Sequence, residues 1–357
     1  MKRYALLITA ALLGISSTMA QSLNKSEAKN LGAFLQQTSQ EGKSNAAALG
    51  IVGNNITAAH GVKIENGRIV EIDWGGKKLA GTLNLSGFPA LTKINVSHNK
   101  ISALTIANNP ALVEVDAGHN AINSFAVSAC PQLQVLRLDR NMLSDLNVGA
   151  VPFLKKLDIS SNYFEALDVT NAFNLETLNA TNNRLQELKV GGCQSLKNLY
   201  AQFNELSGIM LEGLVKLQTL NVGNNHILNL YVQNLPSLTT LFCSDNHMQQ
   251  LAINNCPAIN EVWAPYNDLT AFNISGTANQ LAFVNLEWND LTTLTLSNLS
   301  FLQRLNVANN QLSTLDVSND PNLRTVIVTN NDMLVDFRTE MCPMLTHVVG
   351  AYGYRYF

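Results

Sequence analysis

Two histidines and two carboxylates form the one group in this sequence whose residue types and spacing suit a divalent metal. His98 and His119 stand 21 residues apart, with Glu114 and Asp116 close to the second of them. Imidazole and carboxylate groups are common ligands of zinc and related ions. The same side chains also fit two exposed turns in a polar stretch, since other histidines occupy similar turn positions. We therefore predict no metal site and no cofactor.

Sequence motifs of other enzyme chemistry are missing. The chain has no G-x-S-x-G elbow, H-E-x-x-H helix, phosphate-binding loop or G-x-G-x-x-G unit. General acid–base catalysis needs paired carboxylates held in different environments within a cleft. The repeated surface described below offers no obvious cleft, so the sequence predicts a protein that is not an enzyme.

Three of the five cysteines follow a spacing that argues against disulfide bonds between them. Cys130, Cys193 and Cys256 are 63 residues apart, which is three times the 21-residue period described next. Stacked coils about 4.8 Å apart would separate these residues by roughly 14 Å. Bridged Cα atoms lie within roughly 7 Å of one another. We expect these thiols to serve as small buried packing residues.

An internal repeat dominates the chain and determines its fold. Twelve asparagines recur every 21 residues, with a single gap of 22 between the ninth and the tenth. They are Asn99, Asn120, Asn141, Asn162, Asn183, Asn204, Asn225, Asn246, Asn267, Asn289, Asn310 and Asn331.

Apolar residues hold fixed offsets around each asparagine. One unit reads L-x-x-L-x-V-x-x-N-x-L-x-x-L-x-V, and one example is Leu154, Leu157, Ile159, Asn162, Phe164, Leu167 and Val169. This pattern resembles the leucine-rich repeat family, in particular the short bacterial class of 21-residue repeats sometimes called IRREKO-type. The resemblance covers roughly residues 69–338 and is specific for architecture, but it implies little about the ligand.

The alternation of apolar and polar residues predicts the same architecture. Each Leu-x-Val segment fits a short strand with its apolar side chains pointing inward, so each coil carries two strands. Parallel stacking of coils then makes one continuous apolar column. We predict a mainly β solenoid, a right-handed leucine-rich repeat superhelix of about thirteen coils with two short parallel strands per coil and an N-terminal helical cap.

The asparagines have a structural role in this prediction. A chain that turns away from a strand leaves backbone N–H and C=O groups without partners, at a cost of about 1–3 kcal/mol for each buried group. An asparagine amide both donates and accepts hydrogen bonds. It can therefore satisfy such groups in its own coil and in the neighbouring coil.

The first twenty residues are typical of a secretory signal peptide. Lys2 and Arg3 precede a mostly apolar stretch from Tyr4 to Ile15, and small residues stand before Gln21. The apolar stretch is too short to cross a bilayer comfortably. We predict an exported protein without a membrane span, located in the periplasm, on the cell surface or in the medium.

The ends of the repeat array differ from its interior, as expected for caps that shield the apolar column. Asn24 and Glu27 form a capping-box pattern that begins a predicted helix over residues 25–39. After Leu345 the last coil lacks its asparagine, and tyrosines alternating from Tyr352 to Tyr356 predict an edge strand. The predicted segments are a signal peptide at 1–20, an N-terminal cap at 21–66, the solenoid at 67–338 and a C-terminal cap at 339–357.

Composition and charge limit the class of partner. Only 14% of the residues are charged and 46% are hydrophobic, which indicates a large folded core. The formal charge of −3 and the isoelectric point near 6.1 provide no basic field for a nucleic-acid backbone. We predict a monomer that binds no nucleic acid.

The outward positions of the first strand point to a binding surface. Early coils present mixed charges that fit ordinary solvation, whereas later coils carry a group of aromatic residues. These are Tyr200, Phe203, Phe242, Trp263, Tyr266, Phe283 and Trp288. Large exposed aromatic side chains are typical anchors of protein interfaces. The second-strand face is mostly small and polar, so we expect it to be a solvated flank.

We therefore predict an exported, non-enzymatic recognition module that binds a protein partner through this aromatic patch. A carbohydrate ligand is the first alternative, because tryptophan and tyrosine rings stack on sugars while Asn221, Asn285, Glu261 and Glu287 could hydrogen-bond hydroxyl groups. A passive structural element at the cell surface is the second alternative. The insertion near Gly276 lies beside the patch, which is either open or covered by this insertion.

Overall fold

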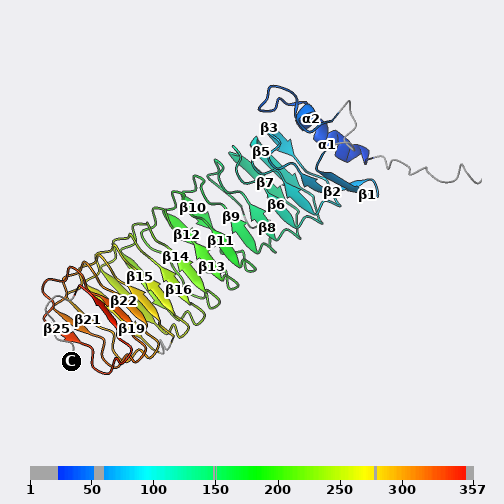
Figure 1. Cartoon of the computed structure of the whole chain (residues 1–357). Coiled ribbons are helices and arrows are strands. Elements are labelled where there is room, and N and C mark those ends of the chain that lie inside the picture. The colour runs from blue at the N-terminus through cyan, green and yellow to red at the C-terminus, as the bar shows by residue number, and fades with distance from the viewer. Residues whose placement is uncertain (1–22, 52–59, 148, 150, 277–279, 351–357) are drawn as a thin grey trace, which may run out of the picture.

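The protein is an elongated solenoid with two helices at its N-terminal end (Figure 1). The computed structural model describes residues 23–51, 60–147, 149, 151–276 and 280–350. The predicted signal peptide, the tyrosines from Tyr352 to Tyr356 and most of the insertion after Gly276 lie outside the described residues. No helix within the described ranges is both long enough and apolar enough to span a membrane.

The first strand of each coil joins one 15-stranded sheet that runs the length of the solenoid. Its pairings are parallel except for the initial β1–β2 hairpin, and coil after coil stays in register, as in Leu178↔Leu199 and Leu199↔Leu220. The strands are β1 (Val62–Glu65), β2 (Arg68–Asp73), β4 (Lys93–Asn95), β6 (Glu114–Asp116), β8 (Val135–Arg137), β9 (Lys156–Asp158), β11 (Thr177–Asn179), β13 (Asn198–Tyr200), β14 (Thr219–Asn221), β16 (Thr240–Phe242), β18 (Glu261–Trp263), β20 (Phe283–Asn285), β22 (Arg304–Asn306), β24 (Thr325–Ile327) and β26 (His347–Val349).

The second strands form four separate short sheets rather than one. The breaks arise partly because the coil at residues 207–213 has no second strand, and neither does the described part of the coil at 145–149. The four sheets are β3 (Ala80–Asn84) with β5 (Lys100–Ala107) and β7 (Ser124–Ser128); β10 (Ala166–Asp168) with β12 (Glu187–Lys189); β15 (Asn229–Gln233) with β17 (Gln250–Asn254) and β19 (Ala271–Ser275); and β21 (Thr293–Thr295) with β23 (Thr314–Asp316) and β25 (Asp336–Arg338).

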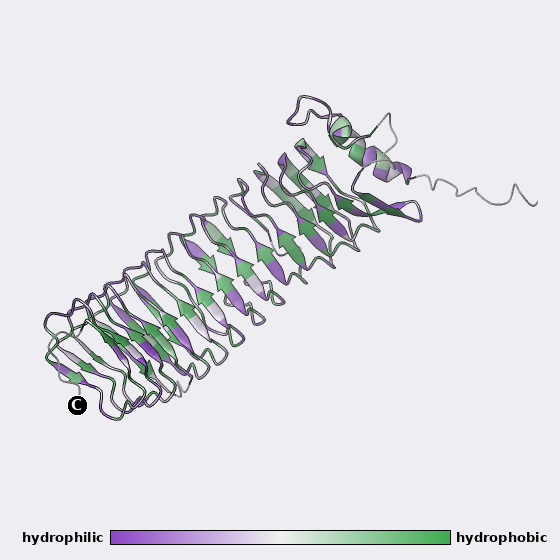
Figure 2. Ribbon diagram, viewed as in Figure 1, coloured by the Kyte–Doolittle hydropathy of each residue, from purple (hydrophilic) through white to green (hydrophobic). Residues whose placement is uncertain are grey.

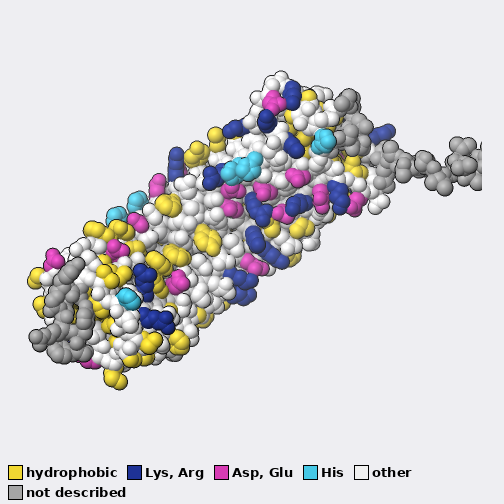
Figure 3. Space-filling view, viewed as in Figure 1, with side chains coloured by type: hydrophobic (Ala, Val, Ile, Leu, Met, Phe, Trp, Pro, Cys, Tyr) yellow, Lys and Arg dark blue, Asp and Glu magenta, His cyan; other side chains and the backbone are white. Residues whose placement is uncertain are grey.

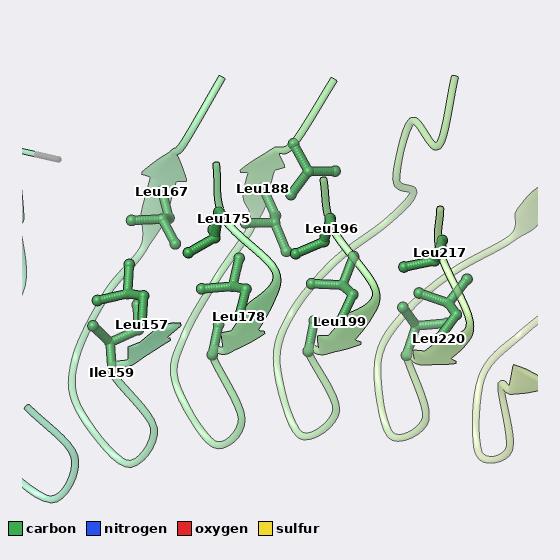
Figure 4. Close-up of a cluster of buried hydrophobic side chains, with 14 of the residues drawn as sticks. Leu157, Ile159, Leu167, Leu175, Leu178, Leu188, Leu196, Leu199, Leu217 and Leu220 are labelled. Carbon is green, nitrogen blue, oxygen red and sulfur yellow. The ribbon is translucent and has the colours of Figure 1, made fainter. Parts of the chain in front are cut away.

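The core is one apolar column inside the coils. Equivalent leucines of successive coils stack on one another, as Leu157, Leu178, Leu199 and Leu220 do in Figure 4, and all four are buried. Hydrophobic residues recur at the same places along the strands of the whole solenoid (Figure 2). No single coil encloses these side chains, so each coil depends on its neighbours for burial.

The asparagine of each coil binds its own turn and the preceding coil, as predicted. In Asn162, Oδ1 accepts a hydrogen bond from the Leu143 amide at 2.9 Å. Its Nδ2 donates to the Leu138 carbonyl of the preceding coil at 2.9 Å and to the Ile159 carbonyl of its own coil at 3.0 Å. The same set recurs at Asn204, so the asparagines form a continuous ladder between coils.

The N-terminal cap contains more regular structure than the sequence indicates. Helix α1 (Lys25–Gln36) ends three residues earlier than predicted, and the rest of the cap includes helix α2 (Asn45–Ala48) and strand β1. The Asn24 side chain caps α1. Glu27 does not return to the cap, because its buried carboxylate accepts hydrogen bonds from the Ile69 amide and Arg68 of the first coil. This contact fixes the helix to the solenoid.

The buried carboxyl group of Asp320 lacks a hydrogen-bond partner that the Asn109 amide has at the equivalent position of another coil. Asn109 and Asp320 each follow a ladder asparagine by ten residues and are fully buried. Asn109 accepts from the Phe88 amide and donates to the Leu85 carbonyl, whereas Asp320 accepts from the Leu299 amide at 2.6 Å and its Oδ2 has no hydrogen-bond partner among the described residues. Burial raises the pKa of Asp320 to about 7.

Asp320→Asn should therefore stabilise the protein above neutral pH. The native state holds the Asp320 proton more tightly than the unfolded chain does. The stability that this protonated group contributes is therefore fully present below about pH 4 and is lost as the pH rises through the native pKa near 7. Asparagine stays neutral and supplies the missing donor. We expect the Tm of Asp320→Asn at pH 8 to exceed wild type by about 3–6 °C, and the difference to vanish near pH 4.

Thermal unfolding followed by circular dichroism across this pH range measures the effect. Asp332→Asn, which neutralises an exposed carboxylate, is the matched control and should change Tm little at either pH. A lower Tm for Asp320→Asn at pH 8 would contradict this account of the site.

Candidate functional site

Three of the predicted aromatic residues form a stack along the first-strand sheet. The Trp263 ring lies between Phe242 and Phe283, with centroid distances of 6.2 Å and 4.4 Å and an interplanar angle of 28° in both pairs. The guanidinium carbon of Arg304 lies 5.6 Å from the Phe283 centroid, which extends the stack by one coil. Each ring is half-buried. Their faces therefore meet one another, and their edges are turned toward solvent.

A second aromatic row lies just beyond the strand ends. Tyr266 and Trp288 stack at 6.0 Å with an interplanar angle of 12°, and about half of each side chain is exposed. These two residues and the three stacked on the strands are hereafter the aromatic array: Phe242, Trp263, Tyr266, Phe283 and Trp288. The insertion between coils leaves this arrangement in register, because Glu261 pairs with Phe283 and Trp263 with Asn285.

The backbone at the second row is left-handed, which is unusual for bulky residues. Phe203, Tyr266 and Trp288 have φ values of 57°, 57° and 53°. Other coils place mainly asparagine, aspartate, serine or histidine at this position, and asparagine in particular tolerates it at low cost. A large side chain in this conformation costs of order 1–3 kcal/mol. The aromatic residues here are therefore not explained by stability of the turn.

The remaining two predicted aromatic residues lie apart from the array. Tyr200 is half-buried on β13 and Phe203 is 54% exposed on the following turn. The next coil presents Asn221 and Asn224 at the equivalent positions, so no aromatic ring bridges Tyr200 to Phe242. The structure thus brings together five of the seven residues and leaves Tyr200 and Phe203 as a separate pair.

Polar side chains border the aromatic array and are already hydrogen-bonded. Glu261 accepts from Nε1 of Trp263 at 3.3 Å. Glu287 accepts from Nδ2 of Asn306 at 2.9 Å and from Nδ2 of Asn309 at 3.3 Å. An apolar centre with a fixed polar rim is the usual anatomy of a protein interface.

Most of the charged side chains of the solenoid lie in its N-terminal half. On the face seen in Figure 3, charged side chains gather toward the N-terminal end and hydrophobic side chains toward the C-terminal end. Arg137 Nη1 lies 2.7 Å from one oxygen of Glu114, and Lys93 Nζ lies 3.3 Å from the other. The Arg137 hydrogen bond is the main reason that the pKa of Glu114 is lowered. This region is an ion-pair network along the stack.

The two histidines considered as metal ligands stack on each other. The His98 and His119 centroids are 4.1 Å apart, and His119 Nε2 lies 3.5 Å from Oδ2 of Asp139. Glu114 is engaged by two cations, so it is not turned toward the histidines. Within the described ranges, no three histidine, cysteine or carboxylate side chains are arranged to hold a metal ion.

All five cysteines are free thiols, which the repeat spacing predicts for Cys130, Cys193 and Cys256. Burial raises the pKa of Cys193 to about 11 and raises that of Cys130 and Cys256 as well. A thiol is nucleophilic mainly as the thiolate. These cysteines are therefore unreactive packing residues.

A hollow lies on the second-strand face, where the sequence suggested only a solvated flank. It has a volume of about 830 Å³ and lies where residues 207–213 pass between β12 and β15. Ile209 and Leu211 keep the apolar spacing of a strand, so the pattern alone predicts no opening there. The one available signal was the glycines Gly191, Gly208 and Gly213, all of which line the hollow.

The same coil architecture occurs in solved leucine-rich repeat structures. The chain resembles the functional domain of InlJ from Listeria monocytogenes, with 28% identity over 60% of this chain and 50% of that chain and a TM-score of 0.51. It resembles the leucine-rich effector protein YopM from Yersinia pestis, with 24% identity over 79% of this chain and 77% of that chain and a TM-score of 0.64. The leucine-rich repeat protein LIC12759 from Leptospira interrogans aligns over 78% of this chain and 95% of its own, with 20% identity and a TM-score of 0.50.

These likenesses show a leucine-rich repeat fold. The chain spans only half the length of the InlJ domain, which includes a cysteine ladder. No protein-family model matches the sequence, and no curated protein matches it.

Trp288→Asn should leave stability unchanged or raise it. Relief of the left-handed strain is worth of order 1–3 kcal/mol, and the lost stacking on Tyr266 about 0.5–1.5 kcal/mol. Chemical denaturation should therefore give an unfolding free energy equal to wild type or higher by about 1 kcal/mol. Trp288→Val is the matched control, because a β-branched residue fits this conformation poorly, and it should be less stable than Trp288→Asn. Equal loss of stability in both variants would refute the strain argument.

Proposed function

We propose that this leucine-rich repeat protein is an exported, non-enzymatic recognition module that binds a protein partner through the aromatic array. The observation that carries the proposal is the pair of aromatic rows on adjacent coils, half-exposed and partly in a strained conformation. Stability does not account for Tyr266 and Trp288 at left-handed positions. Contact with a partner does, because aromatic side chains are the commonest energetic anchors of protein interfaces.

The orientation of the rings favours protein over carbohydrate. A sugar ring stacks on an open aromatic face, whereas both faces of Trp263 are covered by Phe242 and Phe283. Ring edges are suited instead to edge-to-face contact with the aromatic or aliphatic side chains of a protein.

The polar groups considered for sugar binding also support this choice. Glu261 is bonded to Trp263, and Glu287 to two asparagine amides. Asn221 Oδ1 accepts from the Gly223 amide, and Asn285 Oδ1 accepts from the Glu287 amide. Hydroxyl groups of a glycan would have to compete with these internal bonds, so they would gain little.

Simultaneous Trp263→Ala and Trp288→Ala substitution should abolish partner capture without unfolding the protein. The two changes remove the middle ring of the first aromatic row and one of the two rings of the second, and each anchor of this kind contributes at least about 2 kcal/mol to an interface. With residues 21–357 as bait on intact cells and secreted material, the yield of captured protein should fall at least about tenfold, as measured by quantitative mass spectrometry.

Phe153→Ala with Phe173→Ala is the matched control, since both residues are about half-exposed but lie in the turns outside the array. This variant should capture the partner as wild type does. Unchanged capture by the tryptophan variant would contradict the proposed protein interface. Saturable binding to a glycan array, if lost in the tryptophan variant, would instead identify the aromatic array as a carbohydrate site.

A further inference from the structure

The coil at residues 207–213 breaks the second-strand ladder although it keeps the apolar spacing of its neighbours. In the preceding coils, the Gln186 amide donates to the Glu165 carbonyl at 2.8 Å and the Val169 amide to the Lys189 carbonyl at 3.0 Å. One coil later, the amide of Ser207 corresponds to that of Gln186, and the amide of Val190 to that of Val169. Neither donates a hydrogen bond within the described part of the chain.

The break exposes a row of backbone donors. None of the five amides from Ser207 to Leu211 donates a hydrogen bond to any described residue. The segment lines a hollow of about 830 Å³ that extends from β12 to Asn229 and Tyr231 of β15, and a smaller one of about 300 Å³ beside β15. The larger hollow is hereafter the β12 groove. It is open to solvent at an unpaired strand edge, where natural proteins usually prevent pairing.

The β12 groove has room for the backbone of another chain, and its wall carries apolar side chains. A side chain added at Gly191 or at Gly208 would meet no heavy atom within 4 Å, so another chain can approach there closely. Met210 is 75% exposed and Tyr231 is 71% exposed, which is high for an apolar and an aromatic side chain. Unpaired main-chain donors beside exposed apolar side chains are the features by which a sheet edge accepts an additional strand.

The size of the groove determines what can occupy it. β12 has only three residues, and a stable interface with a second copy of this chain would bury about 800 Å² on each partner. A groove of about 830 Å³ instead fits a short extended segment, which advances about 3.3 Å per residue.

The charges at the rim indicate one further feature of the occupant. Lys189 Nζ lies 3.0 Å from Oε1 of Glu187, so these two charges neutralise each other. Glu212 lines the groove at the end of the unpaired segment and makes no ion pair with any described residue. A lysine or arginine at the C-terminal end of an added parallel strand would lie beside Glu212.

We propose that the β12 groove binds a short extended segment of a partner protein, which adds as a parallel strand beside β12 and places a basic residue at Glu212. The strand's carbonyl groups accept from those amides of residues 207–211 that face β12, and its alternate side chains pack on Met210 and Tyr231. This site is distinct from the aromatic array, which lies on the first-strand face.

A labelled synthetic peptide tests the proposal. The probe has the sequence of residues 228–234, which contains the strand β15, followed by one lysine, and its binding to the full mature chain is measured by fluorescence anisotropy. We expect saturable binding below about 1 mM. Hydrogen exchange of those amides between Ser207 and Leu211 that face β12 should slow at least tenfold when the peptide is bound.

Two variants separate this mode of binding from nonspecific contact. Gly208→Val fills the open space without backbone strain, since Gly208 lacks a positive φ, and it should weaken binding at least tenfold. Glu212→Lys should reverse the preference between the lysine-tailed peptide and one that ends in glutamate. A peptide methylated on alternate backbone nitrogens should bind at least tenfold more weakly, and Trp288→Asn should bind the probe as wild type does.

Several results would overturn the proposal. Absence of saturable binding, or binding that survives both Gly208→Val and backbone methylation, would mean that no strand is added. Loss of binding in Trp288→Asn would show that the peptide binds at the aromatic array and not in the β12 groove. Sedimentation that detects a dimer of the free chain, lost in Gly208→Val, would identify a second copy as the occupant instead.

Discussion

No coil of this solenoid can satisfy its own backbone. Each turn after a first strand leaves an amide of the preceding coil and carbonyls of both coils facing inward, and one asparagine amide binds all of them, as Asn162 does. The bonds cross between coils, so they fix the register of one coil on the next. Every other property of the surface depends on that register, because it converts residues 21 positions apart into direct neighbours.

The two candidate sites are opposite departures from this regular stack. The aromatic array adds large side chains at positions that the ladder holds in place, including left-handed ones where Tyr266 and Trp288 bear conformational strain. The β12 groove arises where a strand is missing, so that donors normally paired between coils stay unpaired. In both places a local cost to stability coincides with an exposed surface, as is common at functional sites.

The sequence predicts the solenoid, the asparagine ladder, the free cysteines and the position of the aromatic residues, because each follows from the phase of a residue within the period. It does not predict that the Trp263 ring is enclosed by Phe242 and Phe283, since side-chain stacking depends on rotamers chosen together by three coils. It also misses the groove, because Ile209 and Leu211 keep the strand pattern. Strand formation there depends on the distance to neighbouring coils, which local alternation does not encode.

Residues one repeat apart are immediate neighbours in this structure, and oxidation of paired cysteines tests that most directly. With Tyr266→Cys and Trp288→Cys in one chain, the two Cα atoms should be about 4.8 Å apart, within the range that a disulfide bridges. Mild oxidation should therefore form an intramolecular disulfide, whereas Tyr266→Cys with Asn309→Cys, two coils apart, should form none. Failure of the first pair, or equal bridging in both, would contradict the stacked register and with it the aromatic array.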